Sequence, residues 1–380
     1  MINKFALTVI SAESQVFGGD VESVLVPGMV GDFLVLPDHA ACISSIRPGF
    51  LELTEHGSKK LKYFVSGGIV EVINNEVSVL VDSAVEYDKL VKENVKEIII
   101  YDNMTRGTDE NLKEALKDTR VKIYDVGGDI LQTDILNSAM KGVDGVFNFA
   151  ALWLLQCHEY PRSAFNVNIA GTFNVIEACV NNNIKKMVYS SSASVYGDAD
   201  YEPMDEKHPF NNKNFYGATK IASEAMIRAF HYRYGLNYVG LRYMNVYGQR
   251  QDYHGAYIAV IMKMLDAIDQ GESPTIIGDG SEAFDFVAVE DCAQANLCAM
   301  KSDSNDSFYN VGTGIRTSLK QLAELILEIT ECNKPINYKP RTQNTFVKNR
   351  IGCPQKANKE IGFKSSIDLK EGLKRLIDWR

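Results

Sequence analysis

The chain has 380 residues, 45% of them hydrophobic and 23% charged, which is the length and composition of a folded protein of roughly two to three domains. Lys and Arg total 40 against 49 Asp and Glu, and the net charge of −9 lacks the basic footprint of a nucleic-acid binder. The seven cysteines are widely spaced, with no CxxC pair and no His in metal-ligand spacing. We therefore expect reduced thiols, no metal site and, without a leader or an apolar run of ~18 residues, a cytoplasmic protein.

Residues 1 to about 86 consist of short β-type segments at close spacing, separated by Gly, Pro, Asn and Asp turns. The segments are FALTVIS, VESVLVP, GFLELTE, KYFVSGG, GIVEVIN and EVSVLVD. This pattern predicts a small antiparallel sandwich or barrel.

From about residue 96, buried-type strands alternate with amphipathic segments, which indicates a doubly wound parallel sheet. The strands are EIIIYD, VKIYDV, GVFNFAA, KKMVYSSS and NYVGLRY, and a long helix is expected near Tyr257 to Gln270. The predicted fold class is therefore an all-β sandwich at 1–87 followed by an α/β doubly wound, Rossmann-like domain at 88–380. A small substrate lobe is expected mainly at about 245–285 and 333–380.

The first domain contains GDFLVLPDHAACISSIRPGFLELTEHG and then KYFVSGGIVEVINNEVSVLVDSA, and carries no nucleophile–base pair. Residues 2–87 resemble the N-terminal β-sandwich of the epsilon subunit of F-type ATP synthases, with the order and spacing of the motifs intact. The resemblance implies a structural role in the rotor stalk, docking on the gamma subunit and, in the assembled enzyme, a peripheral position at the membrane. The helical hairpin that follows the sandwich in that family has no counterpart in the sequence.

The second domain places a phenol and an ammonium four residues apart, at Tyr216 and Lys220 of YGATK, where they share one helix face. One such pair is expected by chance in a chain with 18 Tyr, and an exposed helix pair is the alternative. However, Ser192 ends an apolar strand upstream, at the sheet edge where open α/β folds bind ligands. A nearby cation can lower the pKa of a Tyr toward the range of a base, and a serine can bind the hydroxyl that loses its proton.

With SSSASVYG, YGATK and LRYMNVYG, residues 96–380 resemble an extended short-chain dehydrogenase/reductase of the nucleotide-sugar epimerase and dehydratase group. The resemblance implies NAD as cofactor, a nucleotide-sugar substrate and a homodimer. It makes Tyr216 the base, Lys220 the group that tunes it and orders the nicotinamide ribose, and Ser192 the ligand of the reacting hydroxyl.

The same resemblance implies a set of cofactor-binding residues along the strand ends. Asp102 ends the strand EIIIYD and Asn103 follows it, at the position where a carboxylate binds the adenosine ribose; a turn or helix cap is the alternative for Asp102. The remaining positions match the adenine edge, the strand end against the cofactor and a structural asparagine; they are Asp129, Ile130, Ala150, Ala151, Leu152 and Asn168. Packing or capping is the alternative for each of these.

Three residues are expected to contact the substrate. Asn245 in RYMNVYG resembles the family residue that touches the nucleotide diphosphate, and Arg341 in NYKPRTQ falls where an Arg clamps it. Arg350 occupies approximately the position that gates sugar size in hexose 4-epimerases, and its charge favours an acidic or modified sugar. A surface arginine is the alternative for Arg350.

A dinucleotide fold opens with a strand, a glycine-rich turn and a helix, about 20 residues before the ribose-binding acid. The window Asp82 to Lys92, DSAVEYDKLVK, contains no glycine, and KLVKENVKE reads as the tail of the first helix. The glycines of VSGGIVEV lie 35 positions before Asp102 and belong to the sandwich. The epimerase-like part is therefore expected to lack its first strand, its glycine-rich turn and most of its first helix.

We interpret the chain as an NAD-dependent UDP-sugar 4-epimerase-like isomerase attached to an epsilon-like sandwich, with activity impaired by the missing turn. The alternative is an ATP synthase epsilon-like rotor-stalk component, serving proton-driven ATP synthesis, whose C-terminal part is a non-functional passenger. A dehydratase is disfavoured because no acidic pair accompanies Ser192 in the sequence.

Overall fold

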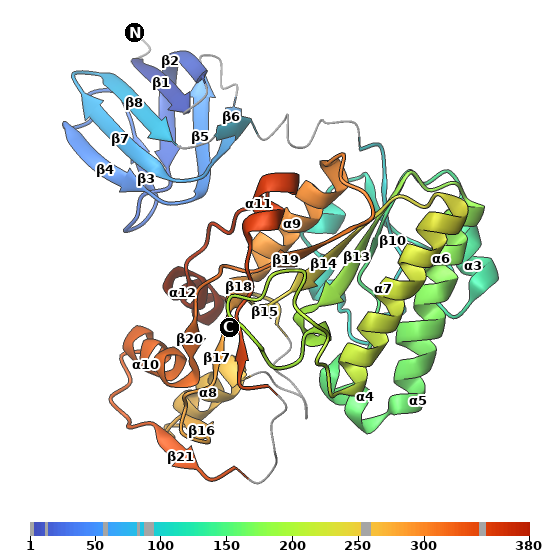
Figure 1. Cartoon of the computed structure of the whole chain (residues 1–380). Helices are drawn as coiled ribbons and strands as arrows, with labels where there is room; N and C mark the ends of the chain where they lie inside the picture. The colour runs from blue at the N-terminus through green and yellow to red at the C-terminus, as the bar shows by residue number, and fades with distance from the viewer. Residues whose placement is uncertain are drawn as a thin grey trace. The chain divides into compact units, whose positions relative to one another are not determined.

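The computed structural model describes residues 4–11, 14–55, 60–81, 84–86, 95–251, 260–341 and 347–380. The chain divides into two compact units, Met1–Ile98 and Ile99–Arg380, which we describe separately (Figure 1). Most of the expected remnant of the first epimerase helix, at residues 89–94, and the start of the helix expected from Tyr257 lie outside the described residues. No helix in the described ranges is long and apolar enough to span a membrane.

The first unit is a β-sandwich built on a single path of strands, β4-β7-β8-β1-β2-β5-β6-β9, with β3 paired to β2. The strands are β1 Phe5–Ser11, β2 Gln15–Val26, β3 Phe33–Val35, β4 Cys42–Ile46, β5 Gly49–Glu55, β6 Lys60–Val65, β7 Gly68–Ile73, β8 Glu76–Val81 and β9 Ala84–Glu86. Alternate side chains point inward, as in β1, where Phe5, Leu7 and Val9 are buried. One pair differs from the expected antiparallel pattern, because β1 and β8 run parallel.

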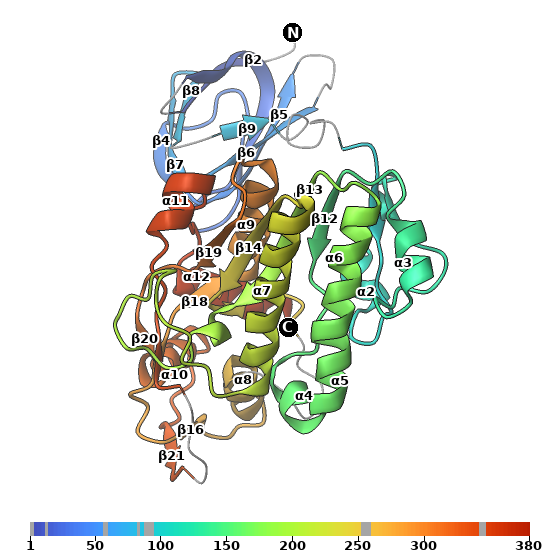
Figure 2. The same cartoon turned by 45° about the vertical axis from the view of Figure 1, so that its right-hand side comes forward.

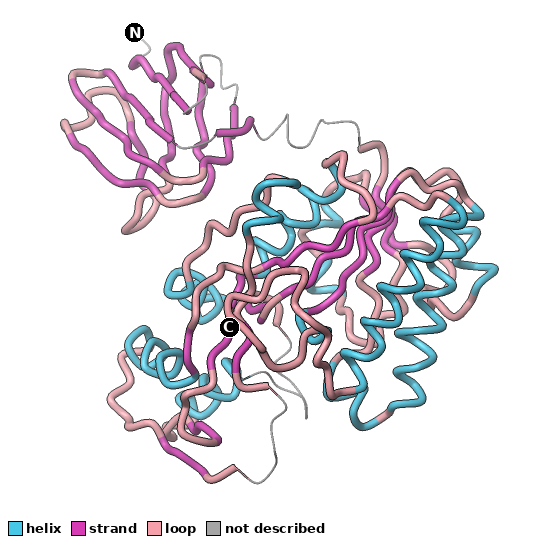
Figure 3. Tube along the Cα trace, in the orientation of Figure 1, coloured by secondary structure: helices cyan, strands magenta, loops and turns pink. Residues whose placement is uncertain are grey.

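The second unit has helices on both faces of a parallel sheet (Figure 3). Its strands are β10 Ile98–Ile100, β11 Val121–Ile123, β12 Gly145–Asn148, β13 Lys186–Ser192, β14 Tyr238–Tyr243, β15 Asn245–Tyr247, β16 Thr275–Ile277, β17 Ala283–Phe284, β18 Phe286–Ala288, β19 Ser307–Val311, β20 Thr317–Ser318, β21 Asn337–Lys339 and β22 Asn349–Arg350. Its helices are α2 Asp109–Leu112, η1 Ala115–Lys117, α3 Thr133–Ala139, α4 Leu154–Glu159, α5 Pro161–Ala164, η2 Phe165–Gly171, α6 Thr172–Asn181, η3 Ala193–Val195, α7 Phe215–Tyr234, α8 Val260–Asp269, α9 Val289–Lys301, α10 Leu319–Ile329, α11 Gln355–Ile361 and α12 Leu369–Trp379.

Strand β13 shows why this sheet is covered on both faces. Met187 and Tyr189 enter the apolar cluster made with α6 and α7, whereas Val188 between them enters the cluster made with α9. Both sets are buried, so β13 has five consecutive buried residues, as expected for a parallel strand that is covered on both faces. The expected Rossmann-like fold with helices on both faces is confirmed.

The sheet is divided where the sequence predicts a missing strand. The strands β12-β13-β14-β19 form one sheet and β10-β11 form a separate pair. Both parts still pack on one apolar cluster, in which Tyr101 after β10 and Val146 of β12 lie against buried residues of α6 and β13. In the usual strand order, the missing first strand lies between the strands that correspond to β10 and β12.

Candidate functional site

The residues expected to carry the chemistry meet at the carboxyl end of β13. Ser192 ends that strand, and its Oγ accepts a hydrogen bond from the Ser194 backbone N–H at 3.1 Å. Helix α7 begins beside this turn, where the Asn214 side chain caps it by accepting from the Gly217 N–H at 2.8 Å. Tyr216 therefore lies in the first turn of α7, with Lys220 one turn further along.

Gly217 allows the helix and the turn to approach closely. A Cβ at this position would lie 2.5 Å from the Ser194 carbonyl oxygen, closer than real Cβ atoms come. Any side chain would therefore push the start of α7 away from the turn after Ser192. This close approach places Tyr216 within hydrogen-bonding reach of Ser192.

Burial sets the protonation of the pair on α7. Desolvation raises the pKa of Tyr216 to about 12, while the hydrogen bond with Ser192 and the charge of Arg350 act to lower it. Desolvation also lowers the pKa of Lys220 to about 8. The Lys220 Nζ donates to the Ser190 carbonyl oxygen at 2.6 Å and lies 5.7 Å from the centre of the Tyr216 ring. The ammonium expected to tune Tyr216 is thus held on the strand, and the cation that acts to lower the pKa of the phenol is Arg350.

A buried ion pair, which the sequence analysis did not single out, lies next to the carboxyl end of β13. Glu224, one turn after Lys220 on α7, accepts two hydrogen bonds from the Arg242 guanidinium of β14, at 2.9 and 2.7 Å. Both side chains are 5% exposed, and the Ser191 hydroxyl also donates to Glu224. The spacing YGATKIASE, with a carboxylate on the same helix face as Lys220, is the signal that could have pointed to Glu224.

The adenosine-side residues lie in two adjoining loops. After β10, the Asp102 Oδ1 accepts from the Met104 N–H at 2.7 Å, and the Asn103 Oδ1 accepts from the Thr105 hydroxyl at 2.7 Å. A Cβ on Gly128 would lie 2.1 Å from the Asp102 carbonyl oxygen, so only glycine lets the second loop pack there. The structure therefore brings the Asp102 loop against the loop that leads to Asp129.

Asp129 and Ile130 are fixed by hydrogen bonds to their backbone carbonyls. The Tyr101 hydroxyl donates to the Asp129 carbonyl oxygen at 3.0 Å, and the Asn174 side-chain amide donates to that of Ile130 at 3.0 Å. The Ile130 side chain is buried in the cluster with α6. Ile130 thus anchors the loop, while the Asp129 Oδ1 accepts from the Leu131 N–H at 2.9 Å.

Asn168 holds the segment after β12 against α7. Its Oδ1 accepts from the Leu152 N–H at 2.7 Å, and its Nδ2 donates to the Leu152 carbonyl oxygen at 2.9 Å and the Thr219 hydroxyl at 3.1 Å. Ala150 and Ala151 are thereby placed between β12 and α4. Asn148, which the sequence analysis missed, is 5% exposed, and its Nδ2 has no hydrogen-bond partner among the described residues.

A dinucleotide fits part of this arrangement. The loops at Asp102 and Asp129 suit a ribose and an adenine, whereas Lys220 and Ser192 lie at the end of β13. The buried Asn148 Nδ2 offers an unused donor at the end of β12. The pyrophosphate between them needs backbone donors at a helix N-terminus after a glycine-rich turn. The sequence before Asp102 contains no such turn, so the residues present do not fit that part of the group.

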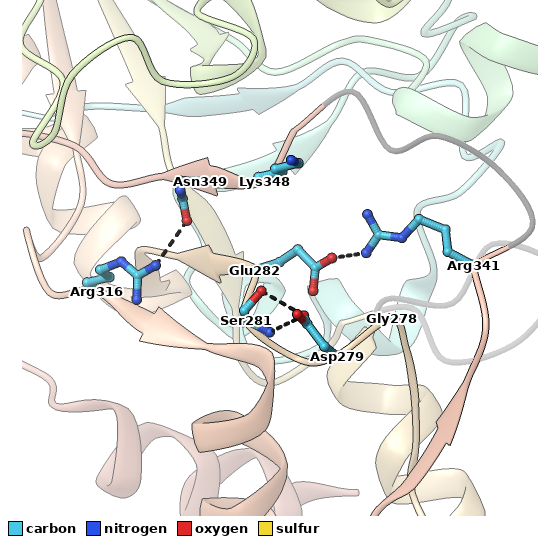
Figure 4. Close-up of a pocket in the computed structure, with 8 residues that line it drawn as sticks. All are labelled: Gly278, Asp279, Ser281, Glu282, Arg316, Arg341, Lys348 and Asn349. Carbon is cyan, nitrogen blue, oxygen red and sulfur yellow. Dashed lines mark hydrogen bonds and ion pairs between the residues drawn. The ribbon is translucent and has the colours of Figure 1, made fainter.

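A cavity of about 470 Å³ with a charged lining lies in the second unit, mostly among residues of the predicted substrate lobe (Figure 4). Its lining residues are Gly278, Asp279, Ser281, Glu282, Arg316, Arg341, Lys348 and Asn349. Arg341 points into it and is paired with Glu282, a carboxylate missed by the sequence analysis, whose Oε2 is buried without a hydrogen-bond partner among the described residues. Three cations facing one cavity suit a phosphate group.

Asn245 and Arg350 are not among the residues that line this cavity. Asn245 begins β15, where its N–H donates to the Asp285 carbonyl oxygen at 2.9 Å. Arg350 lies in β22, next to the cavity residue Asn349, and burial lowers its pKa to about 10. Its Nε is buried and has no hydrogen-bond partner in the described part of the chain.

Both parts of the chain match family models. The model of the NAD dependent epimerase/dehydratase family matches residues 87–312, and that of the ATP synthase Delta/Epsilon chain β-sandwich domain matches residues 4–87. A putative UDP-glucose 4-epimerase of Methanocaldococcus jannaschii is 37% identical over 296 residues, covering 77% of this chain and 92% of the relative. A UDP-glucose 4-epimerase of Mycolicibacterium smegmatis is 27% identical over 285 residues, covering 74% and 90%.

Solved structures give the same grouping. A UDP-N-acetylglucosamine 4-epimerase of Methanobrevibacter ruminantium, in complex with UDP-N-acetylmuramic acid, is 34% identical with a TM-score of 0.70, covering 74% of this chain and 90% of that one. A UDP-glucose 4-epimerase of Thermotoga maritima with UDP-glucose is 30% identical with a TM-score of 0.70, covering 77% and 93%.

Proposed function

The chain belongs to the NAD dependent epimerase/dehydratase family, and from this premise we propose that its second unit epimerises the sugar of a nucleotide sugar at carbon 4. The observation that carries the proposal is that Ser192, Tyr216 and the buried Lys220 meet at one sheet edge, where the Lys220 Nζ lies 5.7 Å from the centre of the Tyr216 ring. Bound NAD would supply the acceptor for the hydride of the sugar carbon.

This chain's own residues would manage the proton. Ser192 would bind the sugar hydroxyl and Tyr216 would accept the proton from its oxygen. A keto sugar results when the hydride of the same carbon also leaves, and its return to the other face of the carbonyl gives the epimer. With its pKa raised to about 12, the phenol of Tyr216 is protonated near pH 7. Phenolate formation therefore depends on neighbouring cations, and Lys220 and Arg350 are the two that the structure provides.

We place the nucleotide diphosphate in the cavity of Figure 4, at Arg341. The family resemblance assigns Asn245 to the same ligand group, but Asn245 does not line this cavity. Because Glu282 already neutralises Arg341, a diphosphate would compete with that carboxylate for the guanidinium. The loops at Asp102, Asn103, Asp129 and Ile130, with Ala150 to Leu152, would hold the NAD ribose and adenine, and Asn168 would keep that surface in place.

Arg350 favours an acidic sugar as substrate. Arg350 is half-buried, and its buried Nε has no hydrogen-bond partner among the described residues. Leaving such a donor unpaired is costly, and a substrate carboxylate would offset that cost. The M. ruminantium structure holds UDP-N-acetylmuramic acid, whose sugar carries a carboxylate, and so gives this proposal indirect support.

The proposed function is tested on the full chain with excess NAD. UDP- and dTDP-sugars are incubated with the protein, and the carbon-4 epimers are quantified by chromatography. Interconversion of a UDP-sugar pair supports the proposal, and absence of any epimer across neutral and acidic sugars contradicts it.

For the first unit we propose docking on the gamma subunit of an ATP synthase. The matching β-sandwich family model supports this, as does a row of exposed apolar side chains, Ile10, Leu80 and Ile69, which are cross-strand neighbours on β1, β8 and β7. Copurification of the full chain with gamma at low salt is expected, and its failure counts against docking.

The homodimer implied by the epimerase resemblance stays a prediction, which light scattering tests.

A further inference from the structure

Strand β12 is a free edge of the four-stranded sheet among the described residues. It pairs with β13 on one side, and β10 pairs only with β11, so the facing edges of β10 and β12 have no ladder partner in the described ranges. In Figure 1 and Figure 2, the cyan segment that contains β10 lies on the β12 side of this sheet. Unpaired backbone N–H and C=O groups at the edge of a sheet can form a ladder with an added strand.

The side chains of β12 also indicate an uncovered edge, because they are less buried than the side chains of the neighbouring strands. In β13 and β14, five consecutive residues are buried, as expected for parallel strands covered on both faces. In contrast, Phe147 is 39% exposed and Phe149, just after β12, is 60% exposed. The two rings stack on each other at 6.1 Å, with planes 3° apart. Two exposed stacked phenylalanines at a sheet edge mark a surface that lacks its cover.

The matches leave 8% of the M. jannaschii relative and 10% of the M. ruminantium chain without a counterpart. A strand, a glycine-rich turn and the start of a helix take about 25 to 30 residues, and a share of that size has room for them. Residues 4–87 of this chain match an unrelated sandwich and so do not supply that unit.

We infer that the facing edges of β10 and β12 bind an extended strand from a second polypeptide, and that its glycine-rich turn completes the pyrophosphate site. This inference rests on the proposed function. The bound strand would need apolar, β-branched side chains to cover Phe147 and Phe149. Its backbone groups would pair with β10 on one side and with β12 on the other. The occupant is thus the opening strand, turn and helix of an epimerase-family chain.

The experiment uses the full chain and a fluorescently labelled peptide of about 30 residues, the opening segment of the M. jannaschii relative. Saturable binding is expected, with increased hydrogen-exchange protection in β10 and β12 and a gain in NAD affinity of at least about a hundredfold. A peptide with a proline in the centre of its strand is the matched control, because it cannot complete the ladder.

Two variants locate the binding. Phe149→Ser should weaken peptide binding at least about tenfold, whereas Leu297→Ser, which removes a side chain 46% exposed on α9, should leave it unchanged. Equal binding of the proline control, equal loss in both variants, or no binding overturns the inference. A chain that dimerises through this edge, and becomes monomeric in Phe149→Ser, also overturns it, because the occupant is then a second copy.

A covalent graft separates this inference from the proposed function. The same segment is inserted before residue 95 of the full chain. If the graft gains NAD affinity and epimerase activity but the free peptide does not bind, the inference fails and the proposed function stands. If the graft binds the cofactor but converts no nucleotide sugar, the proposed function fails.

Discussion

Lys220 Nζ donates a hydrogen bond of 2.6 Å to the carbonyl oxygen of Ser190, two residues before Ser192. The contact ties helix α7 to the strand that carries the serine, so the phenol, the ammonium and the hydroxyl are held by one local structure. Residues of this site can therefore be tested one at a time, each with a matched control.

Tyr216→Phe removes the phenol oxygen that accepts the proton. With NAD in excess, epimerase turnover should fall at least ~10²-fold. Tyr234→Phe, at the exposed end of the same helix, should keep the parent rate. Equal rates for Tyr216→Phe and the parent on the same nucleotide sugar would remove Tyr216 from the mechanism.

Lys220 should leave a signature in stability against pH. Its pKa is lowered in the folded protein to about 8 from 10.5, so between these values the unfolded chain binds more protons and stability rises with pH. Relative to Lys220→Met, the parent should gain stability between about pH 8 and 10.5 in thermal unfolding. Lys213→Met, at an exposed position, should follow the parent, and parallel curves for parent and Lys220→Met would contradict the buried ammonium.

Glu282→Gln tests the competition for Arg341. Without the carboxylate, the guanidinium is available to a diphosphate, so UDP should bind several-fold more tightly by calorimetry. Arg341→Ala should weaken UDP at least about tenfold. Glu272→Gln, on an exposed turn after α8, is the control. Weaker UDP binding by Glu282→Gln would show that the carboxylate orients the arginine and does not compete with the ligand.

Arg350→Met tests the preference for an acidic sugar. The ratio of kcat/KM for UDP-glucuronic acid over UDP-glucose should fall by about tenfold or more, because the partner of the substrate carboxylate is lost. Arg316→Met, on the cavity lining, should leave that ratio unchanged. An unchanged ratio in Arg350→Met means that this guanidinium does not recognise the sugar.

The sequence predicted the framework of this site well because the signals were local. The segments FALTVIS and GFLELTE coincide with β1 and β5, and the serine, tyrosine and lysine sit on the predicted strand end and helix. The segment DENLKEALK forms two short helices, α2 and η1, and neither of them buries a residue.

Other features could not be predicted, because they depend on contacts between distant segments. The pairing of Glu282 with Arg341 and the action of Arg350 on Tyr216 join residues far apart in the chain, and no spacing rule connects them. The short strands β3, β4 and β9 were likewise missed, because each is defined by its ladder partner more than by its own alternation.

The central claim is that this chain can hold the two ends of NAD but not its pyrophosphate. Backbone hydrogen bonds to a charged phosphate contribute about 1.5–3 kcal/mol each, and a helix N-terminus adds roughly 0.3–2 kcal/mol. Losing two such bonds and the helix N-terminus would weaken NAD binding by at least about a hundredfold.

The direct measurement is the NAD released by acid from the purified full chain, counted per chain. We predict less than about one tenth of a molecule per chain, because a site weakened at least a hundredfold loses its cofactor during purification. Close to one NAD per chain would contradict the account, and would require a phosphate-binding segment within this chain that the sequence before Asp102 does not reveal.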